Sequence, residues 1–181
     1  MRLGPRQLRQ RAREVELLVL DVDGVLTDGG LYYGAQGEAL KRFDVKDGHG
    51  LVLAHLTGLR VAILTARRSA IVEKRAEELW IAPVMQGFRD KRAGLAALLE
   101  EANVPPERVG FMGDDVNDLP PMTAVRFAAC PADAVAEVRR ASHYVAKAKG
   151  GRGAVREVVE LLLKAQGKWN QALATMVRPL P

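Results

Sequence analysis

The stretch L-L-V-L-D-V-D-G-V-L-T-D, residues 17–28, decides the fold of this chain of 181 residues. Its first four residues are apolar without interruption, which is typical of a strand buried on both faces of a sheet. Asp21 and Asp23 follow at once, and two carboxylates this close repel each other and resist burial without a cation. In α/β proteins such an acidic pair marks the carboxyl edge of the sheet, where ligands bind. Taken alone, the same letters also fit a solvated turn tightened by Gly24.

Outward from this stretch, apolar β-rich runs alternate with segments of helical period. The alternation predicts an α/β fold with a doubly wound, mostly parallel, Rossmann-like sheet that helices cover on both faces. The expected strands are Leu17–Leu20, Arg60–Leu64, Ala82–Met85, Arg108–Met112, Val125–Ala129 and His143–Val145. The expected helices are Met1–Arg13, Ser69–Leu79, Lys91–Glu101, Ala132–Arg140 and Ala154–Gln166.

Residues 31–45 break the alternation because they read as two short strands around the turn Gly34–Gly37, with no helix between them. This pattern predicts a β-hairpin inserted after the first strand. An insertion at the carboxyl edge of a parallel sheet covers or borders the site, so the hairpin is a candidate flap. We expect residues 1–167 to form a single domain, and for the tail 168–181 disorder is left open.

Composition narrows the function classes. The formal net charge of +5 and the sequence pI near 9.6 suit a protein that binds anions. Only 5% of the residues are aromatic and no zinc spacing occurs, which argues against nucleic acid as the partner. Cys130 is the single cysteine, and no apolar run is long enough to cross a bilayer. We therefore expect a cytoplasmic protein with a small acidic substrate and no membrane contact.

Further polar residues follow the other predicted strands. Thr65 ends the second, Lys91 begins the helix after the third, and an acidic cluster follows the fourth. The acids of that cluster are Asp114, Asp115 and Asp118. Each residue alone has an ordinary explanation, such as a helix cap or a solvated helix position. Because the carboxyl ends of parallel strands share one edge, the set together predicts a functional site there, with a cation beside the acids.

These motifs, in this order, resemble the four motifs of the haloacid dehalogenase superfamily phosphatases across almost the whole chain. The hairpin in place of a large cap domain narrows the resemblance, as do F-D-V-K-D-G at 43–48 and G-G-R-G-A-V-R-E at 150–157. They are similar to the 3-deoxy-D-manno-octulosonate 8-phosphate (KDO 8-phosphate) phosphatases, cap-less tetrameric enzymes of lipopolysaccharide sugar synthesis. Val52 departs from the family pattern, which often has a basic residue in this loop, and Ala66 stands where glycine is usual.

The resemblance implies hydrolysis of a phosphate monoester through an aspartyl-phosphate on Asp21, with Asp23 as general acid and base. Thr65 and Lys91 would bind the phosphoryl oxygens. The implied Mg²⁺ ligands are the carboxylates of Asp21 and Asp114 and the backbone carbonyl of Asp23. Asp115 and Asp118 are expected to orient these ligands rather than to bind the metal.

The resemblance also implies a set of substrate contacts. Besides Asp23 and Lys91, they are Asp44, Val45, Lys46, Asp47, Gly48, Arg67, Arg75 and Arg152. Guanidinium groups suit a substrate that carries a carboxylate and a phosphate, although Arg75 also fits a solvated helix face. We expect a homotetramer in which Gly150–Arg156 completes the site of an adjacent chain. The alternative for this segment is a hinge before the last helix.

Three other readings stay open at this point. A phosphorylation-switched receiver domain also combines acids, Thr, Lys and Mg²⁺ on a doubly wound sheet, but its phosphorylated Asp lies on a central strand away from the acid pair. An inactive relative that serves as a tetramerisation module fits the fold but not the intact acids. Among phosphatases, the nine-carbon sugar acid 9-phosphate is the second candidate substrate.

Overall fold

The computed structural model describes residues 3–177. Its central sheet has six strands, all parallel, in the order β5-β4-β1-β6-β7-β8. The strands are β1 (Leu17–Leu20), β4 (Arg60–Thr65), β5 (Val84–Gln86), β6 (Val109–Met112), β7 (Phe127–Cys130) and β8 (Tyr144–Val145). The predicted α/β architecture is confirmed, and β1 lies inside the sheet between β4 and β6.

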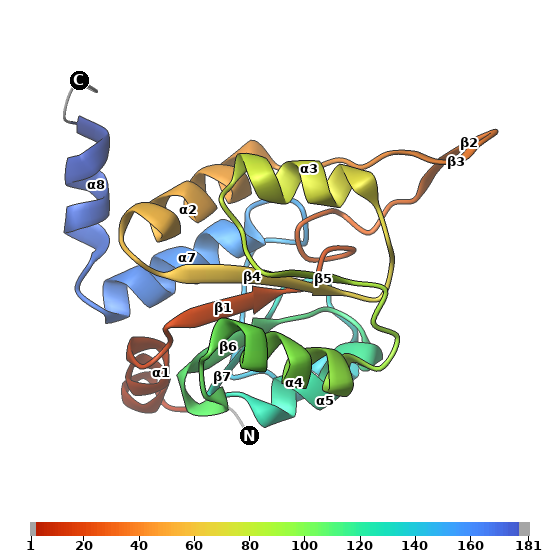
Figure 1. The fold of residues 1–181 in the computed structure, drawn as a ribbon. Coiled ribbons are helices and arrows are strands. Elements are labelled where there is room, and N and C mark those ends of the chain that lie inside the picture. The colour runs from red at the N-terminus through yellow and green to blue at the C-terminus, as the bar shows by residue number, and fades with distance from the viewer. Residues whose placement is uncertain (1–2, 178–181) are drawn as a thin grey trace.

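Helices cover both faces of the sheet (Figure 1). One layer holds α2 (Val45–Leu56), α3 (Ala70–Glu78) and α7 (Ala154–Ala165), and the other holds α4 (Lys91–Ala102), α5 (Leu119–Ala124) and α6 (Ala136–Ala141). Alternate residues of β1 pack into opposite layers: Leu18 and Leu20 into the first, Leu17 and Val19 into the second. Two short 3₁₀ turns, η1 (Pro106–Arg108) and η2 (Val116–Asp118), flank β6.

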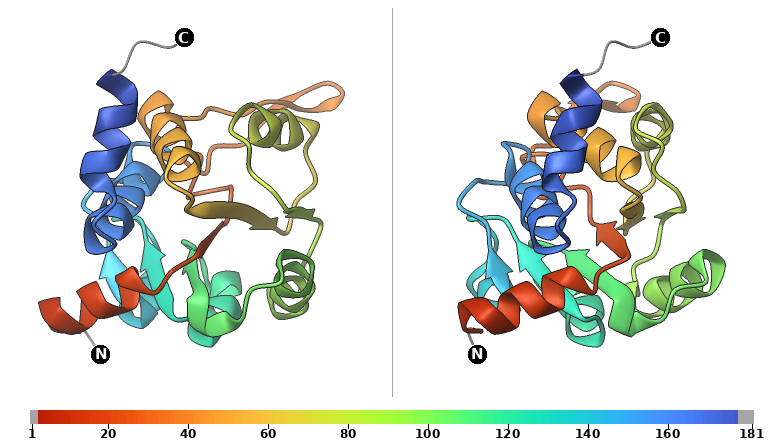
Figure 2. Two further views of the ribbon diagram at one scale, coloured as in Figure 1. Left: turned by 60° about the vertical axis from the view of Figure 1, so that its left-hand side comes forward. Right: turned by 90° about the vertical axis from the view of Figure 1, so that its left-hand side faces the viewer.

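The terminal helices lie outside these two layers. Helix α1 (Pro5–Arg13) packs against α7, and α8 (Trp169–Val177) stands beside α2 and α7 (Figure 2). Helix α8 occupies most of the expected tail, whose residues 178–181 lie outside the described part of the chain. Within residues 3–177 no helix combines the length and apolar character that a bilayer crossing requires.

Helix α2 is absent from the sequence-based expectation. Its start is encoded by Asp44, whose carboxylate accepts the N–H of Lys46 at 2.7 Å as an N-cap. Gly50 lowers helix propensity and obscured the periodic pattern. That glycine serves packing, because a Cβ there would lie 3.1 Å from the Cα of Arg156, where α2 crosses α7. Val52 therefore lies on a helix and not in a loop, and it packs against the core.

Two further differences between the structure and the sequence-based prediction concern the sheet face that α5 and α6 cover. Helix α5 was not expected, because prolines occupy its first turn. Helix α6 begins at Ala136 rather than Ala132, since residues 132–134 turn and Asp133 accepts the backbone N–H of Gly150 at 3.0 Å. The ends of the six strands and of the other three expected crossover or final helices agree with the prediction within two residues.

The predicted hairpin is present as β2 (Tyr32–Gly34) paired antiparallel with β3 (Gly37–Leu40). It projects from the carboxyl edge of the sheet (Figure 1). Its two arms are joined at the base, where the Arg42 guanidinium lies 3.4 Å from the Asp28 carboxylate. The same guanidinium donates to the carbonyl of Gly151 at 3.0 Å, which ties the hairpin base to the loop before α7.

Candidate active site

Polar side chains from the ends of β1, β4 and β6 and from the start of α4 meet at the carboxyl edge of the sheet. They surround a hollow of about 270 Å³. The lining residues are Asp21, Asp23, Gly29, Leu31, Thr65, Ala66, Arg67, Lys91, Asp114, Asp115 and Asn117. The predicted catalytic and metal-binding residues thus come together in the folded chain, with Thr65 held at the buried end of β4.

Lys91 is the buried cation of this hollow, with 1% of its surface exposed. It is the first residue of α4, whose N-cap Asp90 accepts the N–H of Arg92 at 3.0 Å. The Lys91 Nζ lies 2.7 Å from Asp21 Oδ2 and 2.5 Å from Asp118 Oδ1. Burial lowers the pKa of Lys91, but the two carboxylates outweigh this effect and hold the pKa above its ordinary value. Lys91 therefore stays charged beside Asp21.

The acid cluster fits a divalent cation. Asp21, Asp114 and Asp118 each offer an oxygen within 4.8 Å of the others. The Oδ1 atoms of Asp21 and Asp114 are buried and have no hydrogen-bond partner among the described residues. Burial, followed by the neighbouring acids, raises the pKa of Asp21 to about 6 and that of Asp114 to about 8. Unpaired carboxylate oxygens at this density are the ligands that Mg²⁺ prefers.

Asp118 shapes the loop that carries Asp114. Its side chain is fully buried, and its Oδ2 accepts the N–H groups of Asp114 at 3.0 Å and Asp115 at 3.3 Å. A Cβ at Gly113 would collide with the Asp118 side chain, so only glycine fits there. Asp115 is exposed and caps the next turn through the N–H of Val116 at 2.7 Å. Asp118 thus fixes the backbone that carries Asp114, whereas the orienting role expected for Asp115 stays a prediction.

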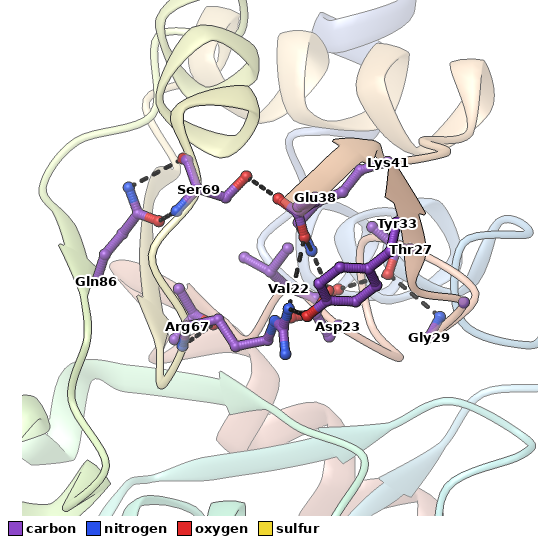
Figure 3. Close-up of polar contacts among 12 residues, drawn as sticks. Val22, Asp23, Thr27, Gly29, Tyr33, Glu38, Lys41, Arg67, Ser69 and Gln86 are labelled. Atoms are coloured by element: carbon purple, nitrogen blue, oxygen red, sulfur yellow. Dashed lines mark hydrogen bonds and ion pairs between the residues drawn. The ribbon is translucent and has the colours of Figure 1, made fainter. Parts of the chain in front are cut away.

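The side chain of Asp23 contacts Lys41, which sequence reasoning missed, and Arg67, which it had named as a substrate contact (Figure 3). Lys41, which follows β3, lies 2.5 Å from Asp23 Oδ1 through its Nζ. The Nε of Arg67 lies 3.6 Å from Asp23 Oδ2, and Arg67 Nη2 donates to the hydroxyl of Tyr33 at 2.8 Å. The available signal was an acid and a base three residues apart, Glu38 and Lys41, within the predicted hairpin.

Other predicted substrate contacts lie away from the hollow of their own chain. Asp44, Asp47, Gly48 and Arg75 line a separate narrow space between α2 and α3, while Val45 and Lys46 are exposed on the first turn of α2. Asp47 is 1% exposed, and its carboxylate accepts the backbone N–H groups of Gly153 at 3.0 Å and Arg156 at 2.8 Å. Within one chain Asp47 therefore caps α7 and does not face the hollow.

The loop before α7 packs onto the loop after β1 of the same chain. A Cβ at Gly150 would collide with the carbonyl of Gly24, and one at Gly151 would collide with the backbone of Thr27. Gly153 has a φ of 100° and begins α7. Arg152 is exposed, with its Nη2 3.8 Å from the Asp28 carboxylate. Close packing within the chain thus explains these glycines, and contact with an adjacent chain stays a prediction.

Comparison with known proteins places the chain in a family. Residues 70–158 match the family model of haloacid dehalogenase-like hydrolases. The 3-deoxy-D-manno-octulosonate 8-phosphate phosphatase KdsC of Yersinia pestis is 45% identical over 163 residues, which are 90% of this chain and 87% of that protein. The chain belongs to the KDO 8-phosphate phosphatase family. KdsC of Escherichia coli K12 is 44% identical over 162 residues, 90% of this chain and 86% of its own.

A solved structure of the family supports the same placement. The crystal structure of the KDO 8-phosphate phosphatase from Moraxella catarrhalis, in complex with a magnesium ion, a phosphate ion and a KDO molecule, has a TM-score of 0.91 and 36% sequence identity. The match covers 96% of this chain and 99% of that chain. The chain therefore shares its overall fold with a relative of known structure that binds magnesium.

The acid cluster predicts how Mg²⁺ stabilises this family member. The pKa of Asp114 is about 8 in the folded protein and 3.8 ordinarily. Without metal, Asp114 is therefore protonated in the folded chain and ionised in the unfolded chain between pH 3.8 and about pH 8. Within that pH range, the contribution of Asp114 to the free energy of unfolding falls by about 1.4 kcal/mol for each unit by which the pH rises. We expect Mg²⁺ to raise the melting temperature at pH 8 and much less at pH 5, where protons compete for the carboxylates.

Calorimetry with Mg²⁺ or with chelator checks this expectation. The Asp114→Asn variant is the control, because it lacks the titrating ligand and is expected to lose both the Mg²⁺-dependent shift and its dependence on pH. An equal Mg²⁺-dependent shift at both pH values, or a shift retained by the variant, would contradict a site built on Asp114.

Proposed function

We propose that this chain is a Mg²⁺-dependent phosphomonoesterase that hydrolyses KDO 8-phosphate to KDO and phosphate through an aspartyl-phosphate on Asp21. The observation that carries the proposal is the family relationship over 90% of the chain, with the acid cluster and its buried cation intact. Membership in this family excludes the receiver domain. The same relationship supports a place in lipopolysaccharide sugar synthesis and a cytoplasmic location.

In the first step the Asp21 carboxylate attacks phosphorus and the bond from phosphorus to the sugar oxygen breaks. Asp23 gives its proton to that oxygen, so the sugar leaves as an alcohol. Lys91 and Thr65 bind the phosphoryl oxygens as charge shifts during transfer. Mg²⁺, when held by the Asp21 and Asp114 carboxylates and the Asp23 carbonyl, supplies positive charge to the phosphoryl group.

In the second step Asp23, now a carboxylate, takes a proton from water while the water oxygen attacks phosphorus. The bond between phosphorus and Asp21 breaks, which releases inorganic phosphate and restores the Asp21 carboxylate. Asp23 is again protonated and ready for the next substrate. The contact of Asp23 with Lys41 keeps its side chain at the hollow through both steps.

We also propose a homotetramer in which adjacent chains complete the substrate site. The hairpin supports this, because Leu31, Tyr33 and Leu40 are exposed on it and natural proteins cover or pair such edges. The segment 44–48 and Arg152 support it as well, since they lie away from their own hollow and would reach substrate only from another chain. Light scattering on the purified chain tests the assembly, and a fully active monomer would contradict it.

Substrate selection is expected to depend on Arg67, which lines the hollow. The Arg67→Met variant should lose roughly 10- to 100-fold in kcat/KM on KDO 8-phosphate, the worth of a charged hydrogen-bonded contact to the carboxylate. Glucose 6-phosphate, which has no carboxylate, should be a poor substrate of the wild type. Its kcat/KM should change much less in the variant. Phosphate release measured across both substrates gives the two ratios.

Arg68→Met is the matched control, because Arg68 is the exposed neighbour and does not line the hollow. Equal cleavage of glucose 6-phosphate and KDO 8-phosphate by the wild type would show that the carboxylate is not recognised. The nine-carbon sugar acid 9-phosphate belongs in the same assay. Val52 packs against the core and does not line the hollow of its own chain, and so gives no reason to prefer this second substrate.

A further inference from the structure

The side chain of Lys41, the residue directly after β3, is covered although the end of that strand is exposed. Ala39 and Leu40 face solvent, whereas the side chain of the next residue, Lys41, is 1% exposed. Lysine is rarely covered to this degree, because removing its charge from water costs several kcal/mol unless a partner compensates. Here the partners are Asp23 at 2.5 Å and Glu38 at 2.9 Å (Figure 3). The hairpin therefore places a paired cation against Asp23.

The contact continues beyond Lys41 as a chain of polar groups. The second oxygen of Glu38 accepts a hydrogen bond from the hydroxyl of Ser69 at 2.5 Å, at the start of α3. The Nη2 of Arg67 lies 3.8 Å from the first oxygen of Glu38. Glu38, itself held by Ser69, thus fixes the position of Lys41, and the ammonium group of Lys41 points toward Asp23. Because a carboxylate on a short side chain rotates freely without such contacts, this direction sets which oxygen of Asp23 is engaged.

We propose that Lys41 is a positioning residue for Asp23: it holds Oδ1 and leaves Oδ2, on the side of Arg67, for proton transfer to the leaving sugar oxygen. The inference rests on the proposed phosphatase function. Proton transfer needs the acid within about 2.6–3.2 Å of the leaving oxygen, and a displacement of about 1 Å costs roughly 100-fold in rate. Glu38 helps to position Asp23 by holding Lys41. The hairpin therefore takes part in the reaction at the active site of its own chain.

How strongly the loss in kcat/KM depends on the leaving group distinguishes a misplaced Asp23 from a general distortion of the hollow. A sugar alkoxide is strongly basic and leaves only as it is protonated, whereas 4-nitrophenolate leaves without a proton. The value of kcat/KM covers the steps up to the release of this first product, so it does not include the attack of water. A misplaced Asp23 therefore lowers kcat/KM on the sugar phosphate selectively. A distorted hollow would lower it on both substrates alike.

The test is Lys41→Met assayed with KDO 8-phosphate and with 4-nitrophenyl phosphate. We expect kcat/KM to fall roughly 10- to 100-fold on the sugar phosphate and by less than about 3-fold on the aryl phosphate. Lys41→Arg keeps the cation and should recover part of the loss. Arg42→Met removes the neighbouring cation, which contacts Asp28 and not Asp23, and should leave the ratio of the two substrates unchanged.

Asp23→Asn gives the reference for losing the proton donor itself. Adding Lys41→Met to Asp23→Asn should cause no further selective loss, because residues that act through one group are not additive. Equal losses on both substrates in Lys41→Met, or an undiminished Lys41 effect in the Asp23→Asn background, would overturn the inference. Should Lys41→Met fail to fold, Glu38→Gln is measured in the same way and decides by the same ratio.

Failure of the proposed function gives a different result. A wild type that cleaves 4-nitrophenyl phosphate but not KDO 8-phosphate would overturn the substrate assignment alone. The ratio would then be measured with the alkyl phosphate that the wild type cleaves fastest. A selective loss there would support the role of Lys41, and an equal loss would overturn it.

Discussion

Replacing Asp21 by asparagine is expected to abolish phosphate release while the fold survives. The amide is no nucleophile toward phosphorus, and the change removes a carboxylate whose Oδ1 is buried without a partner among residues 3–177. Because the nucleophile and the metal act together, we expect a loss of at least roughly 10⁴-fold in kcat. Lys91 keeps its second partner, Asp118. Without metal the variant should melt no lower than the wild type at pH 7, since the change relieves repulsion among the acids.

Phosphate release and thermal unfolding measure the two parts of this expectation. Glu107→Gln makes the same change of charge at an exposed turn and serves as the control. Full turnover by Asp21→Asn would disprove the aspartyl-phosphate mechanism. A variant that is inactive but also unfolded would instead show that Asp21 is needed for stability, against the relief of repulsion expected here.

Replacing Lys91 by methionine is expected to damage both stability and activity. The change leaves Asp21 and Asp118 buried with no cation from the protein between them. Breaking a buried ion pair in this way costs about 3–5 kcal/mol, and losing a phosphoryl contact lowers kcat by roughly 100- to 1,000-fold. The cost in stability should shrink as the pH falls below 6, because Asp21, whose pKa is raised to about 6, then binds a proton and no longer needs the cation.

Denaturant titrations at pH 5 and pH 8, with phosphate release in parallel, test this prediction. Arg92→Met, at the exposed next position of α4, controls for a lost charge near the helix start. A Lys91→Met variant as stable as the wild type at pH 8 would contradict the charged pair. If Lys91→Met does not fold, Lys91→Arg is measured in its place. This variant keeps the positive charge but changes the shape of the side chain, so we expect a stable enzyme with a reduced kcat.

The strand-end residues could be predicted from sequence because one rule of topology places them. Asp21, Thr65 and Asp114 follow separate apolar runs, and parallel strands bring their carboxyl ends to one edge. The burial of Lys91 against Asp21 and the meeting of the acids within 4.8 Å follow from that arrangement. Short-range patterns and a topology rule were therefore sufficient for the centre of the site.

The rest of the site depends on contacts between distant segments that leave no local pattern. The sequence motif of Asp47 suggested a substrate contact, which stays a prediction, but gave no sign that its carboxylate also holds α7, more than a hundred positions away. Gly48 and Gly50 weakened the periodic pattern of α2. Gly50 allows the crossing with α7 at Arg156, and Gly48 leaves room for the Arg75 guanidinium of α3. Lys41 looked like an ordinary charged residue of a hairpin, and only the folded chain shows it covered against Asp23.

The interior position of β1 has a consequence for how this protein is made. The strand that carries the nucleophile is the first of the sheet to leave the ribosome, yet its neighbours are encoded at residues 60–65 and 109–112. The cap that Asp47 places on α7 waits longer still, until residues 153–156 have emerged. Pairings of such long range form late and slowly. The nascent chain therefore carries Asp21 and Asp23 on an unpaired edge of β1 until residues 109–112 have emerged, and its Asp47 carboxylate lacks its backbone partners until residues 153–156 follow.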